Sequence, residues 1–277
     1  MAVFNGNIFS RSLQMNTHVT VVFPDYPDDV LPEPHYGGTR VMYLLHGASG
    51  NAADWSHLTN VTYYAKRYNY IVIMPEVQLS FYTNMRYGLD YYSYAAEELP
   101  RKMNELFHLP QGREKTFIAG LSMGGYGAGK IGFRNPDMFG GVACFSALID
   151  IVGQQRHILT APELLPPQFD LRHWTGTFGD PMAVNPCEDD LFEIVKSVVS
   201  RADRPLFLQT CGTDDPLYPA NLKFREHLNA LGYGHTYLEW KDGHTWPFWD
   251  RSLELAMRFF AGETVSAEDD GAYDRRA

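Results

Sequence analysis

The chain has 277 residues, of which 45% are hydrophobic and 14% aromatic, and its formal net charge is −10. This length falls within the range of one large α/β domain and allows a core that needs no disulfide or metal. Nucleic acids and anionic membranes select basic surfaces, so the charge argues against both as partners, and it does not disfavour a neutral small molecule. A strongly anionic substrate would need a local pocket that overrides the net charge.

The N-terminal stretch, residues 1–14, has no basic segment followed by an apolar one, so we expect no signal peptide. No apolar run reaches the length of a membrane span. Short β-rich segments then recur, several of them continuous apolar runs, which are typical of strands covered on both faces. The predicted strands are 17–23, 41–45, 70–74, 116–119, 142–145, 205–210 and 235–240.

Helical segments fall between these strands. Their alternation predicts an α/β fold with a doubly wound, mainly parallel sheet and helices on both faces. We expect one domain over residues 1–262. The predicted helices are 91–107, 123–133, 189–200, 219–231 and 247–260.

Two segments depart from this alternation. Residues 147–186 contain Pro162, Pro166 and Pro167 and scattered aromatics. We interpret them as an insertion over one end of the sheet, with a long connecting loop as the alternative. The tail, 263–277, is polar and charged, and we expect it to be disordered.

The stretch GLSMG, from Gly120 to Gly124, fits the motif G-x-S-x-G and lies between a predicted strand and a predicted helix. In this context it predicts a nucleophile elbow, the tight turn that presents the hydroxyl of Ser122 at the end of the sheet. Side chains two residues before and after the serine would collide, so both glycines have a steric role. The helix dipole would favour negative charge developing beside Ser122.

The same region offers a second interpretation, because Gly124 to Lys130 fits most of a phosphate-binding loop, G-x-x-x-x-G-K. That loop needs Ser or Thr after the lysine to bind Mg²⁺, and Ile131 stands there. Its glycines would also have to precede the helix, whereas 123–133 is best explained as the helix itself. We therefore favour the elbow.

A serine nucleophile needs a base and an orienting acid, and in folds with this elbow the acid follows the serine and the histidine comes last. Asp214 and Asp215 both follow the strand 205–210, and either could be the acid. His244 lies between the last strand and the last helix, where a base facing the elbow is expected.

An oxyanion hole is predicted where the strand 41–45 runs into HGASG. The residue after such a His-Gly pair can offer its backbone N–H, so Ala48 and Met123 are the expected donors. His46 lies too early in the chain to be the base and should hold the loop by hydrogen bonds. In this mechanism His244 takes the proton from Ser122 as it attacks a carbonyl, and water later releases the acyl group.

Five segments together resemble the tributyrin esterase family, a group of esterase D-like serine carboxylesterases related to feruloyl and acetyl-xylan esterases. The resemblance extends from about Asn16 to Phe260. The segments are LLHGASGNAADW, PEVQLSFYTNMRYGLDYYSYAAEELP, GLSMGGYGA, CGTDDPLYPANLKFREHL and DGHTWPFWD.

The resemblance implies an α/β-hydrolase fold and hydrolysis of short-chain acyl or acetyl esters, with no metal and no organic cofactor. It implies Ser122 as nucleophile and His244 as base, and the family's GTED pattern, which ends in the acid, selects Asp215 over Asp214. Members of the family often assemble, so a homo-oligomer is among the expected states.

The substrate stays open at this point. A feruloyl or acetyl-carbohydrate esterase and an S-formylglutathione hydrolase-like thioesterase are the alternatives, although HGASG departs from the esterase D pattern. An inactive binding protein on the same fold and a nucleotide hydrolase are alternatives of other classes. We expect Trp55, Tyr82 and Trp246, with residues of the insertion, to line the acyl pocket; an ordinary aromatic core is the alternative for each.

The cysteines bear on the compartment. Cys144, Cys187 and Cys211 are few, odd in number and widely spaced, which favours reduced thiols. With no signal peptide expected, we predict a cytoplasmic location.

Overall fold

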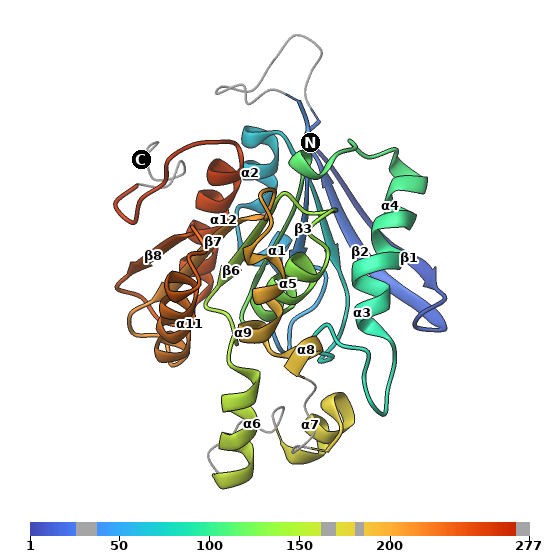
Figure 1. Ribbon diagram of the computed structural model, residues 1–277. Coiled ribbons are helices and arrows are strands. Elements are labelled where there is room, and N and C mark those ends of the chain that lie inside the picture. Colours follow the sequence, from blue (N-terminus) through green and yellow to red (C-terminus); the bar gives the residue numbers. More distant parts are fainter. Residues whose placement is uncertain (26–37, 162–169, 181–185, 270–277) are drawn as a thin grey trace.

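The computed structural model describes residues 1–25, 38–161, 170–180 and 186–269. Its centre is an eight-stranded sheet with the order β1-β2-β4-β3-β5-β6-β7-β8 (Figure 1). β2 runs antiparallel to β1 and to β4, and all neighbours from β4 to β8 are parallel. The strands are β1 (Ala2–Ser10), β2 (Met15–Phe23), β3 (Arg40–Leu45), β4 (Tyr70–Pro75), β5 (Thr116–Leu121), β6 (Gly141–Phe145), β7 (Leu206–Gly212) and β8 (Thr236–Trp240).

Helices connect the parallel strands, as the alternation predicts. None of the described helices combines the length and the apolar character that crossing a membrane requires. They are α1 (Asp54–Leu58), α2 (Val61–Tyr68), α3 (Tyr91–Ser93), the π-helix η1 (Tyr94–Glu98), α4 (Leu99–Phe107), the 3₁₀ helix η2 (Arg113–Lys115), α5 (Met123–Arg134), α6 (Ile151–Thr160), α7 (Leu171–Phe178), α8 (Pro186–Asp189), α9 (Leu191–Ile194), α10 (Lys196–Val199), α11 (Tyr218–Ala230) and α12 (Trp246–Phe260).

The central strands β3, β4, β5 and β6 are buried on both faces, which confirms the interpretation of the continuous apolar runs. Along β3, Val41, Tyr43 and Leu45 belong to one core cluster, which also holds residues of α4, α5, α9 and α11. Met42 and Leu44 point into a second cluster, built with α2 and α12. Because successive strand residues face opposite sides, each face of β3 needs its own apolar set.

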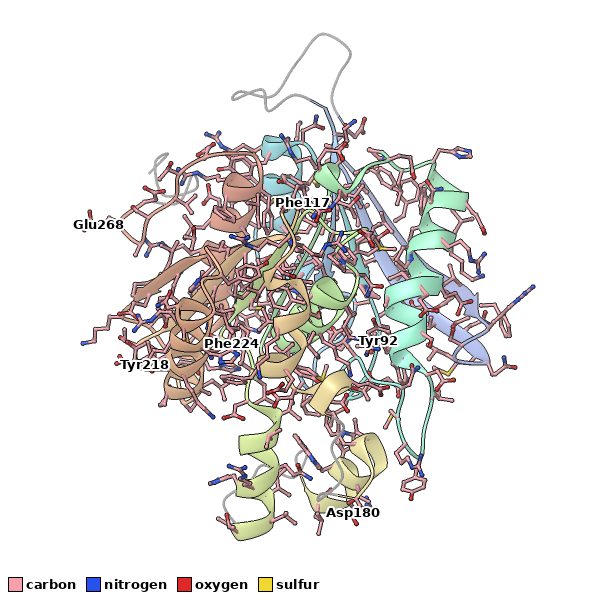
Figure 2. All side chains as sticks on the ribbon, in the orientation of Figure 1. Tyr92, Phe117, Asp180, Tyr218, Phe224 and Glu268 are labelled. Carbon is pink, nitrogen blue, oxygen red and sulfur yellow. The ribbon has the colours of Figure 1, made fainter. Side chains whose placement is uncertain are left out.

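Aromatic residues anchor the helices to these two faces. Phe117 of β5 stacks on Phe260 of α12, with ring centroids 4.6 Å apart and an interplanar angle of 10°. On the other face Phe224 of α11 is fully buried. Figure 2 labels Phe117 and Phe224 within the outline of the molecule and Glu268 at its periphery.

Some elements differ from the prediction. The sequence does not predict β1, because most of its side chains are exposed and its pattern carries no strand signal; pairing with β2 over nine residue pairs holds it. It does not predict α1 and α2 either. The helix 91–107 contains the π-turn η1, where the N–H of Leu99 bonds to Tyr94 O just before Pro100, which has no N–H to donate. The helix 189–200 is divided between α9 and α10.

The segment 147–186 carries α6 and α7, which extend below the sheet in Figure 1 and leave the carboxyl end of β6. This arrangement agrees with an insertion over one end of the sheet. Residues 162–169 and 181–185 of that segment lie outside the described residues.

The segment 263–269, which begins the tail that we expect to be disordered, lies beside α12. Val265 is buried, and Arg251 and Arg258 of α12 bond to the segment 263–269. Residues 270–277 lie outside the described part of the chain.

Candidate active site

Ser122 stands at the turn between β5 and α5, where the sequence predicts the elbow. Its backbone adopts φ 53° and ψ −118°, a conformation that non-glycine residues rarely adopt and that is found mainly at functional sites. The surrounding backbone holds the turn: the N–H of Ser122 donates to Phe145 O over 2.9 Å, and its carbonyl accepts from the N–H groups of Tyr126 and Leu148.

The glycines of the motif have the predicted steric role. A Cβ at Gly120 would collide with the backbone carbonyl of Gly124. A Cβ at Gly124 would collide with the carbonyls of Leu45 and His46, at the end of β3. These contacts are with backbone atoms, which cannot move aside as a flexible side chain can. The elbow therefore requires glycine at both positions.

His244 and Asp215 lie together, as predicted. Nδ1 of His244 is 2.8 Å from Oδ2 of Asp215, while Oδ1 of the same carboxylate accepts the N–H of Leu217 over 2.8 Å. The Asp215 side chain is fully buried and that of His244 is 30% exposed. Asp214, the alternative acid, is exposed. The geometry thus selects Asp215.

The environment of Asp215 keeps its carboxylate charged. Burial by itself raises the pKa of Asp215, but hydrogen bonding and charge attraction from His244, followed by the N–H of Leu217 and the hydroxyl of Ser146, outweigh it and leave the pKa below its usual value. The resulting anion fixes a proton on Nδ1 of His244. Its other ring nitrogen, Nε2, is then free to act as a base.

Two loops must approach closely to form this pair. A Cβ at Gly212, at the end of β7, would collide with the carbonyl of Asp242 in the loop after β8. The N–H of Asp214 donates to that same carbonyl over 3.0 Å. The side chain of Asp242 in turn accepts the Thr245 hydroxyl over 2.9 Å. These contacts position His244 from the β8 side.

Ser122 and His244 line one small cavity of about 210 Å³. Among the described residues no hydrogen bond joins their side chains, and such bonds commonly tighten only when substrate is bound. The full lining is Gly47, Ala48, Ser49, Gly50, Asp54, Leu121, Ser122, His244, Trp246 and Trp249.

The predicted oxyanion residues adjoin this cavity. Ala48 lines it, and Met123 is the first residue of α5, directly after Ser122. The loop of Ala48 runs against the elbow: a Cβ on Gly47 would collide with the Leu121 side chain and lie 3.5 Å from Cβ of Ser122. Ala48 and Met123 thus lie beside the serine, where an oxyanion hole requires backbone N–H donors.

His46 holds the oxyanion loop, as expected. Nδ1 donates to Gly47 O over 2.8 Å, and Nε2 accepts the N–H of Val77 over 3.2 Å. The side chain is buried, and Glu76 lies 3.5 Å from Nε2. Because both ring nitrogens are occupied, His46 has a structural role.

Two of the three predicted pocket aromatics lie elsewhere. Trp55 is fully buried, and its indole N–H donates to Leu45 O over 3.1 Å. Tyr82 is also fully buried, with its hydroxyl donating to His46 O over 2.9 Å. In this conformation neither ring can touch a substrate, and both brace the backbone behind the cavity. Trp246 does line the cavity, where it packs edge-on against Trp55.

Sequence reasoning missed three cavity residues. Trp249 lies one turn after Trp246 on α12, and its ring packs edge-on against His244 with centroids 4.8 Å apart. The helical spacing of the two tryptophans was the available signal. Leu121 immediately precedes the serine. Asp54 opens α1, a helix that the sequence does not predict.

The phosphate-loop interpretation is wrong. The glycines from Gly124 onward form the helix α5 itself. Lys130 is 1% exposed and donates to Asp189 over 2.7 Å and to Thr83 over 2.8 Å. A lysine committed in this way is not available to a phosphate.

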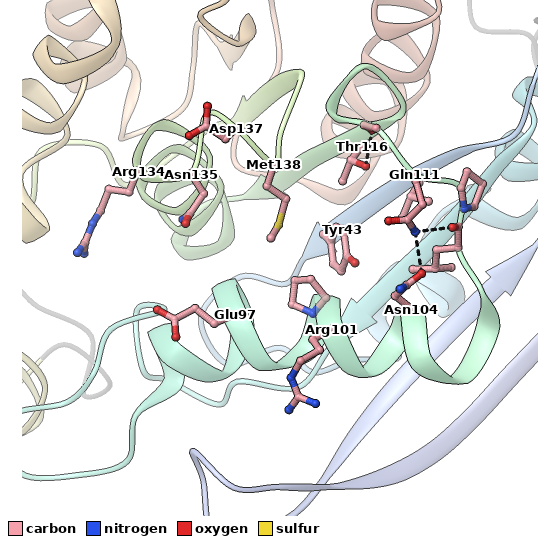
Figure 3. Close-up of a pocket in the computed structure, with 15 residues that line it drawn as sticks. Tyr43, Glu97, Arg101, Asn104, Gln111, Thr116, Arg134, Asn135, Asp137 and Met138 are labelled. Carbon is pink, nitrogen blue, oxygen red and sulfur yellow. Dashed lines mark hydrogen bonds between the residues drawn. The ribbon is translucent and has the colours of Figure 1, made fainter.

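A larger cavity, of about 620 Å³, lies at the amino ends of β3 and β5, away from Ser122 (Figure 3). Val41 and Thr116 in its lining begin β3 and β5, whereas Ser122 follows the end of β5. At about 3.3 Å per residue, the length of β5 separates it from the elbow. Amides of Asn104 and Gln111, bonded to each other, contribute to its wall. It contains no part of the serine–histidine–aspartate group.

Comparisons with known proteins identify the family of the chain. The Esterase family, described as "Putative esterase", matches residues 10–260. An acetyl esterase from Caldicellulosiruptor saccharolyticus is 31% identical over 272 residues, which cover 94% of this chain and 98% of that protein.

Two solved structures from Staphylococcus aureus are similar over nearly their whole length. The substrate-bound fluorophosphonate-binding serine hydrolase F gives a TM-score of 0.81 at 27% identity, covering 95% of this chain and 99% of that one. The S-formylglutathione hydrolase FrmB, as apoenzyme, gives 0.79 at 28% identity, with 94% and 99% covered. The chain therefore belongs to this esterase family, has the α/β-hydrolase fold, and is a serine carboxylesterase.

Proposed function

We propose that this carboxylesterase hydrolyses short-chain esters, chiefly acetyl esters, with Ser122 as nucleophile, His244 as base and Asp215 as orienting acid. The observation that carries the proposal is the bond between His244 Nδ1 and the buried Asp215 carboxylate, with His244 lining the same cavity as Ser122. This is the arrangement that activates a serine hydroxyl.

The reaction proceeds in two halves. Nε2 of His244 takes the Ser122 proton as Oγ attacks the ester carbonyl, and the Asp215 carboxylate stabilises the imidazolium that forms. The N–H groups of Ala48 and Met123 bind the oxyanion. His244 then gives its proton to the departing alcohol, leaving an acyl group on Ser122. Water, activated by the same histidine, attacks the acyl carbonyl and restores the serine.

The size of the cavity supports a small acyl group. Drug-sized ligand sites are typically about 300–1,000 Å³, and this cavity is about 210 Å³. Leu121, Trp246 and Trp249 give it apolar walls. The similarity to an acetyl esterase over 94% of the chain supports the same assignment. A ferulate group, with its aromatic ring, would need more room.

A thioesterase of the S-formylglutathione hydrolase kind is the second candidate. The similarity to the S. aureus enzyme FrmB favours it, and a formyl group is small enough for this cavity. The two candidates differ in the alcohol or thiol portion of the substrate. A cytoplasmic location is part of the main proposal, supported by the buried free thiols of Cys144 and Cys211.

The test is fluorophosphonate labelling with mapping of the adduct, followed by a panel of aryl esters from acetate to octanoate. We expect the label on Ser122, activity that declines beyond butyrate, and loss of both in Ser122→Ala. Ser49→Ala, a serine on the same cavity, is the matched control and should keep both. An unlabelled chain, or full activity in Ser122→Ala, would contradict the assignment.

A further inference from the structure

The wall of the catalytic cavity has one acidic side chain, Asp54, and no lysine or arginine among its described lining residues. Asp54 begins α1, and its Oδ2 accepts the N–H of Asn51 over 3.1 Å. A Cβ on Gly50 would collide with the same oxygen, so the carboxylate lies directly against the oxyanion loop. In the described part of the chain no basic side chain lies within 4.0 Å of it.

A charge in this position affects any charged substrate that reaches Ser122. The cavity is only about 210 Å³ in volume, so a substituent close to the scissile bond stays near Asp54. Unit charges about 8 Å apart in partly solvated surroundings change a rate by several-fold. The net charge of −10 acts in the same direction at longer range. The charge of the cavity wall therefore has the same sign as the net charge of the chain, and both repel an anionic substrate.

We propose that Asp54 is a specificity-determining residue: its carboxylate disfavours esters that carry negative charge near the scissile bond and favours neutral or cationic ones. The inference rests on the proposed function, because the ester must occupy this cavity. It names neutral and cationic alkyl or aryl esters as the substrate class. It also makes a glutathione thioester, whose peptide part is anionic, a poor substrate.

Asp54 also has a structural contact, which the test must separate from its charge. The bond from the Asn51 N–H needs only an oxygen acceptor, and Asp54→Asn retains one while removing the charge. Any remaining effect on the oxyanion loop would alter the turnover of all esters together. The ratio of kcat/KM between a charged and a neutral ester isolates the effect of charge.

The experiment compares three aryl acetates whose leaving groups differ in charge: 4-acetoxybenzoate, methyl 4-acetoxybenzoate and 4-acetoxyphenyltrimethylammonium. Intrinsic reactivity cancels when each ratio is compared between wild type and variant. We expect Asp54→Asn to raise the anionic-to-neutral ratio about three- to tenfold and to lower the cationic-to-neutral ratio similarly. Added salt should reduce the discrimination by the wild type.

Asp137→Asn is the control, because it removes one negative charge from an 83% exposed side chain that lines the larger cavity at the amino ends of β3 and β5. It should leave both ratios within about twofold of wild type. Equal changes for all three esters in Asp54→Asn, or unchanged ratios, would overturn the role of charge while leaving the esterase assignment intact. Failure of the wild type to hydrolyse any of the three would contradict the proposed function, and this inference with it.

Discussion

Nδ1 of His244 lies 2.8 Å from Oδ2 of Asp215, although 29 positions separate the two residues in the sequence. The carboxyl ends of β7 and β8 bring them together, and Gly212 allows the two loops to touch. The neighbouring Asp214, one position earlier, is exposed. Adjacent carboxylates in one loop thus have different environments, which makes them a matched pair for experiment.

Asp215→Asn should lower kcat by about 10³–10⁴, because an amide would stabilise the wrong tautomer of His244 and could not balance the imidazolium. Asp214→Asn should stay within about twofold of wild type, since an exposed charge contributes little. Steady-state kinetics with an aryl acetate measures both. A large loss in Asp214→Asn with an active Asp215→Asn would reverse the assignment of the acid.

Gly124→Ala should destabilise the chain by about 2–3 kcal/mol and reduce activity, because its Cβ would press on the backbone carbonyls of Leu45 and His46. Gly176, also within a helix, has open space where a Cβ would lie. Gly176→Ala should be neutral or stabilising by about 0.5–1 kcal/mol. Urea unfolding and esterase rates measured on both variants make the comparison; equal stability of the two would show that the elbow can relax.

Trp246→Leu should shift the acyl preference toward longer chains, because Trp246 forms part of an apolar wall of a small cavity. We expect the ratio of kcat/KM for hexanoate over acetate to rise about tenfold, which corresponds to about 1.4 kcal/mol. Tyr87→Ala, at a 72% exposed side chain outside the cavity, is the control and should not change the ratio. An unchanged preference in Trp246→Leu would place the acyl group elsewhere.

Glu98 stabilises the turn between β1 and β2 through bonds from the Ser10 hydroxyl (2.7 Å) and from the N–H groups of Arg11 (2.8 Å) and Ser12 (3.0 Å). Burial would raise the pKa of Glu98, but these bonds outweigh it and lower the pKa from 4.5 to about 2. The stabilisation is therefore complete above about pH 4.5 and is lost as the pH falls toward 2.

Glu98→Gln should consequently lower the free energy of unfolding by about 1.5–3 kcal/mol at pH 7. The difference from wild type should narrow below about pH 4.5, as the wild-type carboxylate takes up a proton. Urea unfolding between pH 7 and pH 3 measures this, with the exposed Glu105→Gln as a control that should show almost no difference. If the difference in the free energy of unfolding between wild type and Glu98→Gln does not vary with pH, the charge of Glu98 is not its cause.

The sequence by itself determined the parts of this protein that depend on local chemistry. Short β-rich segments predicted seven of the strands, and several of these are continuous apolar runs, because strands buried on both faces need apolar residues at every position. Gly120 and Gly124 around Ser122 predicted the elbow, since only glycine fits so tight a turn. The order of serine, acid and histidine then located the loops of Asp215 and His244.

The tertiary structure decided what depends on contacts between distant segments. β1 exists because β2 pairs with it, not because its own sequence is strand-like. The sequence does not reveal whether an aromatic residue faces the core or the cavity, so it places Trp55 and Tyr82 in the pocket and misses Trp249. The sequence likewise does not reveal that Asp54 lines the cavity. Its charge matters only because folding brings α1 beside Ser122, and spatial proximity of this kind is not recorded in local residue patterns.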